Sequence, residues 1–265
     1  MNNPIAIVDS GVGGLACIDF IRKAMPEEDI IYFGDTANMP YGTKTAEEIC
    51  AAQKKVAEFL KAQDVKMVIL ACNTLSAVAV PLYYETLPLA ITQNIIEPSI
   101  TATSRVCTTE SRLGIIATPM TIESGVHKAA FDKLKKKFAI FYKGCPELSV
   151  YIERGITEGP ELEKLLHEYM DGLVYEDKID TLLLGCTHYP LVADCIHKLY
   201  PELKLVDPAE SLARVSSMML NLHEMSADED REGSLRICVS RRTESFVTMA
   251  GNLGFGDIPV EEVVL

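Results

Sequence analysis

The feature of the sequence that most constrains its fold is an alternation of strands and helices that occurs twice. In the first half, the apolar runs IAIVDS, DIIYFGD and MVILACNT occupy residues 5–10, 29–35 and 67–74. Stretches with helical spacing of apolar residues separate them, at 14–25 and 45–63. Strand, helix, strand, helix, strand predicts a parallel sheet with helices on its faces.

The same order begins again in the second half of the chain. LGIIATPMT, FAIFYKGCP and DTLLLGCTHYP, residues 113–121, 138–146 and 180–190, are the strand-like runs. Helical patterns at 121–137 and 158–175 lie between them. This repetition predicts an α/β protein with two pseudo-symmetric lobes, each a parallel-sheet unit, and an active site in the cleft between them.

The predicted lobes are unequal in length. We expect residues 1–97 together with 211–265 to form the first lobe and residues 98–210 to form the second. The tail contains one more short strand pattern, LRICVS at 235–240, which we expect to pack back on one lobe.

Charge and composition exclude several classes of function. The formal net charge of −13 argues against a nucleic-acid partner, since phosphate binding requires a basic surface. Neither a secretion signal nor an apolar run of the ~20 residues needed to span a membrane is present, so we expect a cytoplasmic protein with no membrane contact. Its eight cysteines should then be reduced, and the absence of C-x-x-C spacing predicts no metal site.

Polar side chains follow the ends of the predicted strands in both halves. Ligands of open parallel sheets bind beyond the carboxyl ends of the strands, so these residues are candidates for a site. They are Asp9, Ser10, Cys72, Asn73, Thr74, Thr118, Thr121, Cys186, Thr187 and His188.

Two cysteines at matching strand ends suit one kind of chemistry. If the lobes face each other, Cys72 and Cys186 approach the cleft from opposite sides. Inversion of a carbon requires a base on one face and an acid on the other, and a thiol with a pKa of ~8.5 can serve as either. Asp9 and His188 are polar neighbours that could assist. Buried packing cysteines are the simpler alternative, but packing does not require Asn-Thr and Thr-His to follow them.

Four motifs together resemble those of a known family. DSGVGG (9–14), YFGDTANMPYGTK (32–44), ACNT (71–74) and GCTHYPL (185–191) are similar to segments of the glutamate racemases, within the aspartate/glutamate racemase superfamily. The resemblance extends in order and spacing from about residue 5 to about residue 207. It implies interconversion of L- and D-glutamate without a cofactor, with the D-isomer supplied to peptidoglycan synthesis, and it leads us to expect a homodimer.

The resemblance also implies roles for individual residues. Cys72 matches the thiol that acts on D-glutamate and Cys186 the one that acts on L-glutamate, with Asp9 and His188 as their assistants. Glu153, in YIERG, matches a further catalytic glutamate. The implied contacts of glutamate, the small-molecule partner, are Asp9, Ser10, Tyr41, Gly42, Asn73, Thr74, Thr121, Thr187 and His188.

Three alternatives remain at this point. A racemase of the same superfamily could act on aspartate, a hydantoin or another carboxylic acid, and a non-catalytic protein could bind glutamate in the same cleft. The third is a nicotinamide-dependent dehydrogenase, because Gly11, Gly13 and Ala16 fit G-x-G-x-x-G/A and Asp35 ends the next strand. Against it, Asp9 would place a carboxylate beside the phosphates of the cofactor.

Overall fold

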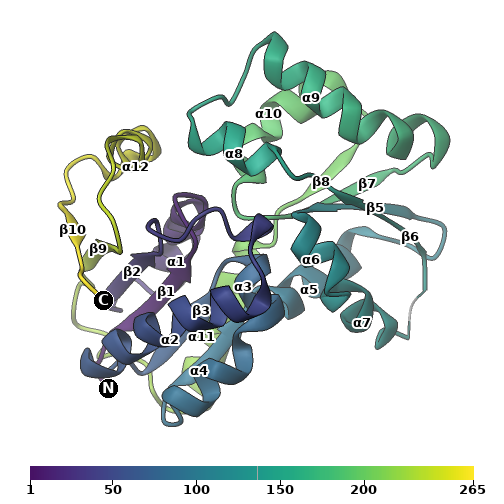
Figure 1. Ribbon diagram of the computed structural model, residues 1–265. Helices are drawn as coiled ribbons and strands as arrows, with labels where there is room; N and C mark the ends of the chain where they lie inside the picture. The colour runs from purple at the N-terminus through teal and green to yellow at the C-terminus, as the bar shows by residue number, and fades with distance from the viewer. Residues whose placement is uncertain (136) are drawn as a thin grey trace.

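The computed structural model describes all residues except residue 136, and it contains two parallel sheets flanked by helices (Figure 1). The first sheet has the strand order β10-β9-β2-β1-β3-β4 and the second has the order β6-β5-β7-β8. The strands of the first sheet are β1 (Ile5–Asp9), β2 (Ile30–Gly34), β3 (Met67–Leu70), β4 (Ile91–Asn94), β9 (Leu235–Val239) and β10 (Val260–Glu262). Those of the second are β5 (Arg112–Ala117), β6 (Ala139–Gly144), β7 (Thr181–Gly185) and β8 (Lys204–Val206).

The two sheets repeat one topology, which confirms the predicted fold class. The order β2-β1-β3-β4 in the first sheet corresponds to β6-β5-β7-β8 in the second, strand for strand. Every pairing in both groups is parallel. β1 and β5 are therefore equivalent, as are β3 and β7, and the strands that precede the two candidate cysteines occupy matching positions.

Helices and short helical turns connect the strands and cover the sheets. The best-defined start is that of α2, where Thr45 accepts from the Glu48 amide at 3.2 Å and Glu48 accepts from the Thr45 amide at 2.8 Å. The longer helices are α1 (Ile18–Ala24), α2 (Ala46–Ala62), α4 (Val80–Thr86), α5 (Ile96–Val106), α7 (Val126–Asp132), α9 (Pro160–Asp171), α10 (Ala193–Leu199), α11 (Ala209–Leu222) and α12 (Glu244–Ala250). The shorter ones are η1 (Gly13–Cys17), η2 (Tyr41–Thr43), α3 (Asn73–Val78), α6 (Pro119–Glu123), α8 (Leu148–Glu153), η3 (Gly172–Glu176), η4 (Tyr189–Val192) and η5 (Gly251–Phe255).

The helix predicted over 121–137 is wrong in its extent. Two short helices, α6 and α7, replace it, because Gly125 between them has a φ of 68° and interrupts the helical backbone. α7 ends at Asp132, and residue 136 of the predicted helix lies outside the described residues. A left-handed backbone at glycine is a common way to end a helix, and helical spacing of apolar residues does not reveal it.

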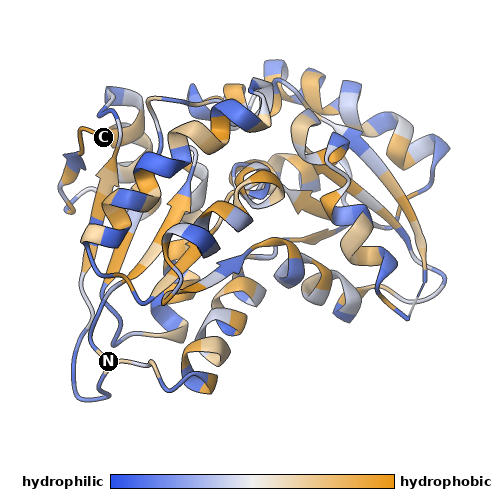
Figure 2. Cartoon of the chain, turned by 60° about the horizontal axis from the view of Figure 1, so that its bottom comes forward, coloured by the Kyte–Doolittle hydropathy of each residue, from blue (hydrophilic) through white to orange (hydrophobic). Residues whose placement is uncertain are grey.

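The first sheet is buried on both faces, and β1, which ends at Asp9, is one of its central strands. Ile5 and Ile7 pack with Leu15 in one apolar cluster, whereas Ala6 and Val8 belong to the cluster on the opposite face. Successive residues of a strand point to opposite faces, so this continuous apolar run is the pattern of a central parallel strand. Figure 2 shows the hydrophobic strands enclosed by helices that turn hydrophilic residues outward.

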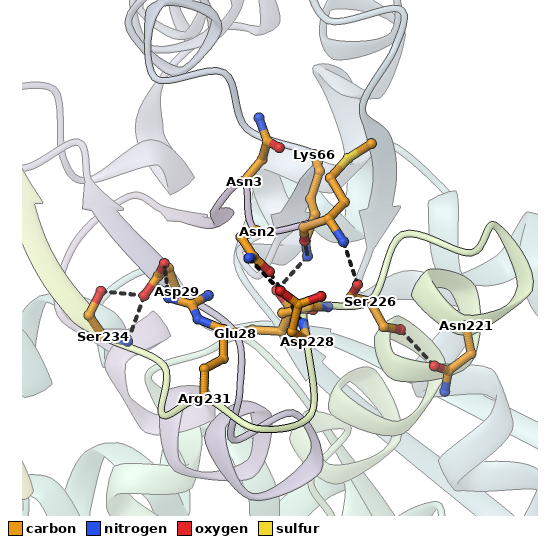
Figure 3. Close-up of polar contacts among 12 residues, drawn as sticks. Asn2, Asn3, Glu28, Asp29, Lys66, Asn221, Ser226, Asp228, Arg231 and Ser234 are labelled. Carbon is orange, nitrogen blue, oxygen red and sulfur yellow. Dashed lines mark hydrogen bonds and ion pairs between the residues drawn. The ribbon is translucent and has the colours of Figure 1, made fainter.

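The tail of the chain returns to the first sheet. β9 pairs with β2, and polar contacts anchor the segment before β9 at the amino ends of the strands (Figure 3). Glu28 forms a buried ion pair with Lys66 at 2.7 Å and accepts from the Ala227 amide at 2.8 Å. Asp29 pairs with Arg231 at 2.6 Å. These contacts lie at the amino ends of the strands, whereas Asp9 and the candidate site lie at the carboxyl ends.

Two helices lie where the lobes join. α11 packs against α1 and β4 of the first lobe, and α5 packs against α11 as well as against α7 and β7 of the second. Because α5 contacts both lobes, the boundaries at 97 and 211 stay predictions. Among the described helices, none is long and apolar enough to cross a membrane.

Candidate active site

A pocket lies between the carboxyl ends of the two sheets. Residues of both lobes line it, including both cysteines that the sequence singled out. They are Ser10, Met39, Pro40, Tyr41, Gly42, Cys72, Thr74, Thr118, Ser149, Glu153, Cys186 and His188.

Cys72 stands at the start of α3, directly after β3. Its Sγ accepts a hydrogen bond from the amide of Leu75 at 3.5 Å, and its S–H group donates to Ser10 Oγ at 3.9 Å. Burial, and after it the charge of Asp9, raise the pKa of Cys72 to about 12, although the hydrogen bond from the Leu75 amide acts to lower it. Before substrate binds, this thiol is therefore protonated and suited to act as an acid.

Asp9 ends β1 and is fully buried beside the glycine-rich turn. Its Oδ2 accepts from the amides of Gly11 and Gly14, both at 3.1 Å, and its Oδ1 accepts from Thr187 Oγ1 at 3.1 Å. Burial raises the pKa of Asp9, opposed by the charge of His188 and by these hydrogen bonds. The hydrogen bond to Thr187 joins the two lobes at the site.

Cys186 follows β7 and belongs to a row of three interacting side chains. His188 Nδ1 lies 3.5 Å from Cys186 Sγ, and His188 Nε2 lies 2.6 Å from Glu153 Oε1. Burial opposes a charge on the ring, but Cys186 and Glu153 outweigh it and raise the pKa of His188 well above its usual value. A protonated imidazole places a positive charge beside the sulfur of Cys186.

Glu153 comes to the site from the end of α8. Its Oε1 also accepts from the amide of Val12 in the first lobe at 3.1 Å. This carboxylate therefore contacts both lobes, and it orients His188 toward Cys186. The structure places Glu153 in the pocket with Cys186 and His188.

Three threonine hydroxyls form a cluster at the pocket. Thr74 Oγ1 lies 2.9 Å from Thr118 Oγ1 and 3.0 Å from Thr121 Oγ1, and the last two lie 2.9 Å apart. Thr74 and Thr121 were predicted substrate contacts from opposite lobes. Since hydroxyls rotate freely, the cluster can turn its donors toward a bound carboxylate.

Tyr41 and Gly42 form part of one pocket wall, in the turn η2. The hydroxyl of Tyr41 is occupied elsewhere, because it donates to Asp35 and accepts from Gln53. Tyr41 therefore faces the pocket with its backbone and ring. A Cβ at Gly42 would lie 3.0 Å from Thr118 Cβ, so a larger residue here would require Thr118 to move by a few tenths of an ångström.

Asn73 and Thr187 line a second pocket, which also contacts Cys186. Both amide atoms of the Asn73 side chain are buried without a hydrogen-bond partner among the described residues. A buried amide in this state is suited to bind a polar ligand. Every predicted site residue except Asp9 and Thr121 lines one of the two pockets, and hydrogen bonds connect those two to residues that do.

Some pocket residues escaped prediction. Ser149, Met39 and Pro40 line the pocket, and Thr118 lines it although only Thr121 was selected as a substrate contact from that strand end. Ser149 had a signal in the sequence, because it lies one helical turn before Glu153 on α8 and shares its face. Met39 and Pro40 directly precede Tyr41, so adjacency alone would have suggested them.

The glycine-rich turn is not arranged as a dinucleotide-binding loop. Its amides at Gly11 and Gly14 bind the carboxylate of Asp9 in the same chain. A Cβ at Gly13 would lie 2.6 Å from Thr187 Oγ1, so the turn packs against the second lobe rather than facing a phosphate. Asp35 accepts from Tyr41, Asn38 and Ser240, which leaves it in no position to bind a ribose. Among the described residues, no group of three or more His, Cys, Asp or Glu could hold a metal ion.

Comparison with known proteins identifies the family. Residues 16–215 match the family model described as Asp/Glu/Hydantoin racemase. The chain belongs to this family. Glutamate racemase 1 of Caldanaerobacter subterraneus subsp. tengcongensis is 36% identical over 94% of this chain and 92% of its own length, and the glutamate racemase of Geobacter metallireducens is 37% identical over 95% and 92%.

Solved structures of family members have the same two-lobed fold. The glutamate racemase of Francisella tularensis subsp. tularensis, in complex with D-glutamate, superposes with a TM-score of 0.90 at 30% identity, covering 100% of this chain and 98% of that one. The resemblance drawn from the four sequence motifs is thus confirmed. So is the expectation that this racemase-family chain is an isomerase.

Proposed function

We propose that this racemase-family protein interconverts L- and D-glutamate through two thiols and without a cofactor. The observation that supports this most strongly is the presence of Cys72 and Cys186, from equivalent strands of opposite lobes, in one pocket. The relatives named glutamate racemase match along nearly the whole chain, and the Francisella tularensis relative was solved with D-glutamate.

The two cysteines have different neighbours, Asp9 for Cys72 and His188 for Cys186, and we propose that each serves one face of the substrate carbon. With L-glutamate bound, the Cys186 thiolate beside protonated His188 removes the α-proton, and the electron pair of the C–H bond moves into the adjacent carboxylate. The protonated thiol of Cys72 then gives its proton to the opposite face of the carbon, which completes the inversion. Cys72 ends as a thiolate and Cys186 as a thiol, the state needed for the reverse reaction on D-glutamate.

The remaining polar groups are placed to hold the substrate. We propose that Asp9 and Thr187 meet the ammonium group, because their hydrogen bond lies where the lobes meet. The free amide of Asn73 and the hydroxyls of Ser10 and Thr74 can bind carboxylate oxygens. Backbone amides of the turn at residues 41–42 complete the pocket opposite the second lobe.

The cellular setting follows from the family and from the sequence. We propose that D-glutamate made by this protein supplies peptidoglycan synthesis, that the protein works in the cytoplasm, and that it forms a homodimer. The lobe boundaries near residues 97 and 211 are part of the same proposal. The peptidoglycan role and the homodimer are expectations from the family resemblance, whereas the location and the lobe boundaries are expectations from the sequence itself.

The experiment that tests the proposal is a racemisation assay on a panel of substrates. Pure protein with reduced thiols and no added cofactor is incubated in D2O with L-glutamate, D-glutamate, L-aspartate or a hydantoin, and the products are separated by chirality. We expect rapid loss of the α-proton signal and formation of the opposite enantiomer with glutamate. Racemisation of aspartate or a hydantoin but not glutamate would retain the two-thiol mechanism and overturn the substrate. If none of these substrates loses its α-proton, the result would favour a protein that binds glutamate without catalysing a reaction.

A further inference from the structure

Asp35 is a fully buried carboxylate next to the site, and the proposed reaction does not use it. It directly follows β2, and its amide donates to the carbonyl of Asp9 at 2.9 Å, so the two carboxylates stand side by side at the strand ends. Four donor contacts converge on its oxygens. Ser240 Oγ donates to Oδ1 at 2.6 Å, Tyr41 OH donates to Oδ2, and Asn38 Nδ2 contacts both oxygens at 3.0 and 3.1 Å.

These contacts continue into the helices that cover the first sheet. Gln53 of α2 donates to the hydroxyl of Tyr41, and Tyr83 of α4 donates to Gln53 Oε1. All three side chains are buried. The side chain of Tyr41 is thereby held from two sides, by Asp35 and by Gln53, and these hydrogen bonds restrain the turn η2, which begins at this residue.

Residues of the carboxyl-terminal tail form hydrogen bonds with the segment that directly follows Asp35. Ser240 Oγ accepts from the Ala37 amide at 2.9 Å, and the amide of Arg241 donates to Thr36 Oγ1 at 3.0 Å. Both residues directly follow β9. Asp35 therefore connects the end of β9 with the segment of the chain that leads to the pocket.

That segment forms one wall of the pocket. Residues 39–42 all line the pocket, and we call them the 39–42 wall. Gly42 lies so close to Thr118 of the second lobe that an added Cβ would be 3.0 Å from Thr118 Cβ. Displacement of this wall would change the width of the pocket without touching Cys72 or Cys186.

We propose that Asp35 is a positioning residue that sets the place of the 39–42 wall and thereby the affinity for substrate. This rests on the proposed function, since the wall is taken to contact glutamate. Asp35→Asn is nearly isosteric but places an NH2 group among donors, so a hydrogen bond to a charged acceptor is lost. We expect the KM for glutamate to rise about tenfold, with kcat within about threefold of the parent, because the reacting groups stay in place.

A double-mutant cycle separates this role from a general loss of stability. Tyr41→Phe removes one hydroxyl, keeps the ring and is the milder change, so it serves if Asp35→Asn folds poorly. If the two residues act together, the double variant raises KM no further than Asp35→Asn alone. The matched control is Asp29→Asn, at the opposite end of β2, which breaks the ion pair with Arg231 and should leave KM unchanged.

Amide hydrogen exchange without substrate gives a readout that needs no activity. We expect Asp35→Asn and Tyr41→Phe to accelerate exchange within residues 36–44 and to leave residues 73–78 unchanged. Unchanged KM and exchange in both variants, or additive effects in the cycle, would overturn the proposal. If the parent protein failed to racemise glutamate, the exchange result would still test the role of Asp35, so the two proposals fail separately.

Discussion

Replacement of Glu153 by glutamine should slow racemisation by removing the charge that keeps His188 protonated. Glu153 Oε1 lies 2.6 Å from His188 Nε2, with 11% and 5% of the two side chains exposed. Glutamine has nearly the same shape, and its amide oxygen can still accept from Val12, so the change removes a charge and spares the packing. The effect should therefore appear in catalysis more than in folding.

The size of the effect follows from this nearly buried charged hydrogen bond. Such a bond contributes about 1.5–3 kcal/mol. If the transition state loses that amount, kcat/KM falls about 10- to 150-fold. The raised pKa of His188 keeps the ring charged below that pKa, and the charge is lost as the pH rises through it. Without Glu153 that pKa is lower, so the alkaline fall in activity should begin at a lower pH.

The assay is a profile of kcat/KM against pH for Glu153→Gln and for a matched control. Glu147→Gln alters an exposed carboxylate directly before α8 and should behave as the parent does. Circular dichroism and thermal unfolding establish that both variants are folded. A Glu153→Gln variant with the parent's rate and pH profile would refute the role assigned to this carboxylate.

Three further predictions concern the thiols, acid stability and the pocket wall. Cys72→Ala and Cys186→Ala should each reduce racemisation at least about 1000-fold by chiral analysis, because each face then lacks its proton carrier, whereas Cys50→Ala should be active. His127 is buried and its pKa is lowered to about 4 by burial, so the unfolded state binds a proton first as the pH falls below about 6.5. Between about pH 7 and pH 5 this should cost about 2 kcal/mol of unfolding free energy, which His127→Leu should abolish in urea titrations. Gly42→Ala should raise KM about tenfold in steady-state kinetics, since its methyl group, 3.0 Å from Thr118 Cβ, must push that residue of the facing lobe out of place.

Each of the three has a clear contrary result. Racemisation at the parent rate by either cysteine variant would rule out two-thiol chemistry. Equal loss of stability on acidification in parent and His127→Leu would place the acid-sensitive group elsewhere. An unaltered KM in Gly42→Ala would mean that the close approach of the lobes at this turn does not govern substrate binding.

The sequence predicted the two cysteines because their positions follow from local patterns. A buried parallel strand appears as an apolar run, and the residue after its carboxyl end faces the site whatever the rest of the fold does. Repetition of that pattern in both halves then placed Cys72 opposite Cys186. β4 and β8 were missed as a matching pair, since four and three residues of mixed polarity show little periodicity.

Contacts between distant segments could not be predicted in this way. Glu153 was selected through the family resemblance alone, because nothing near it in the chain indicates that α8 carries it to Val12 and His188. Asp35 shows the opposite case. Its place after a strand suggested a ribose ligand, whereas Tyr41, Asn38 and Ser240 occupy its oxygens in the folded chain.

The measurement that tests the central claim most directly is the destination of deuterium in the first turnovers. The parent protein is incubated in D2O with L-glutamate, and separately with D-glutamate, and the label in both enantiomers is followed by proton NMR and chiral mass analysis. Two thiols on opposite faces predict that newly formed product carries deuterium at the α-carbon while the remaining substrate retains its proton. Product that retains the original proton would mean that a single group serves both faces, and would contradict the assignment of Cys72 and Cys186 as separate acid and base.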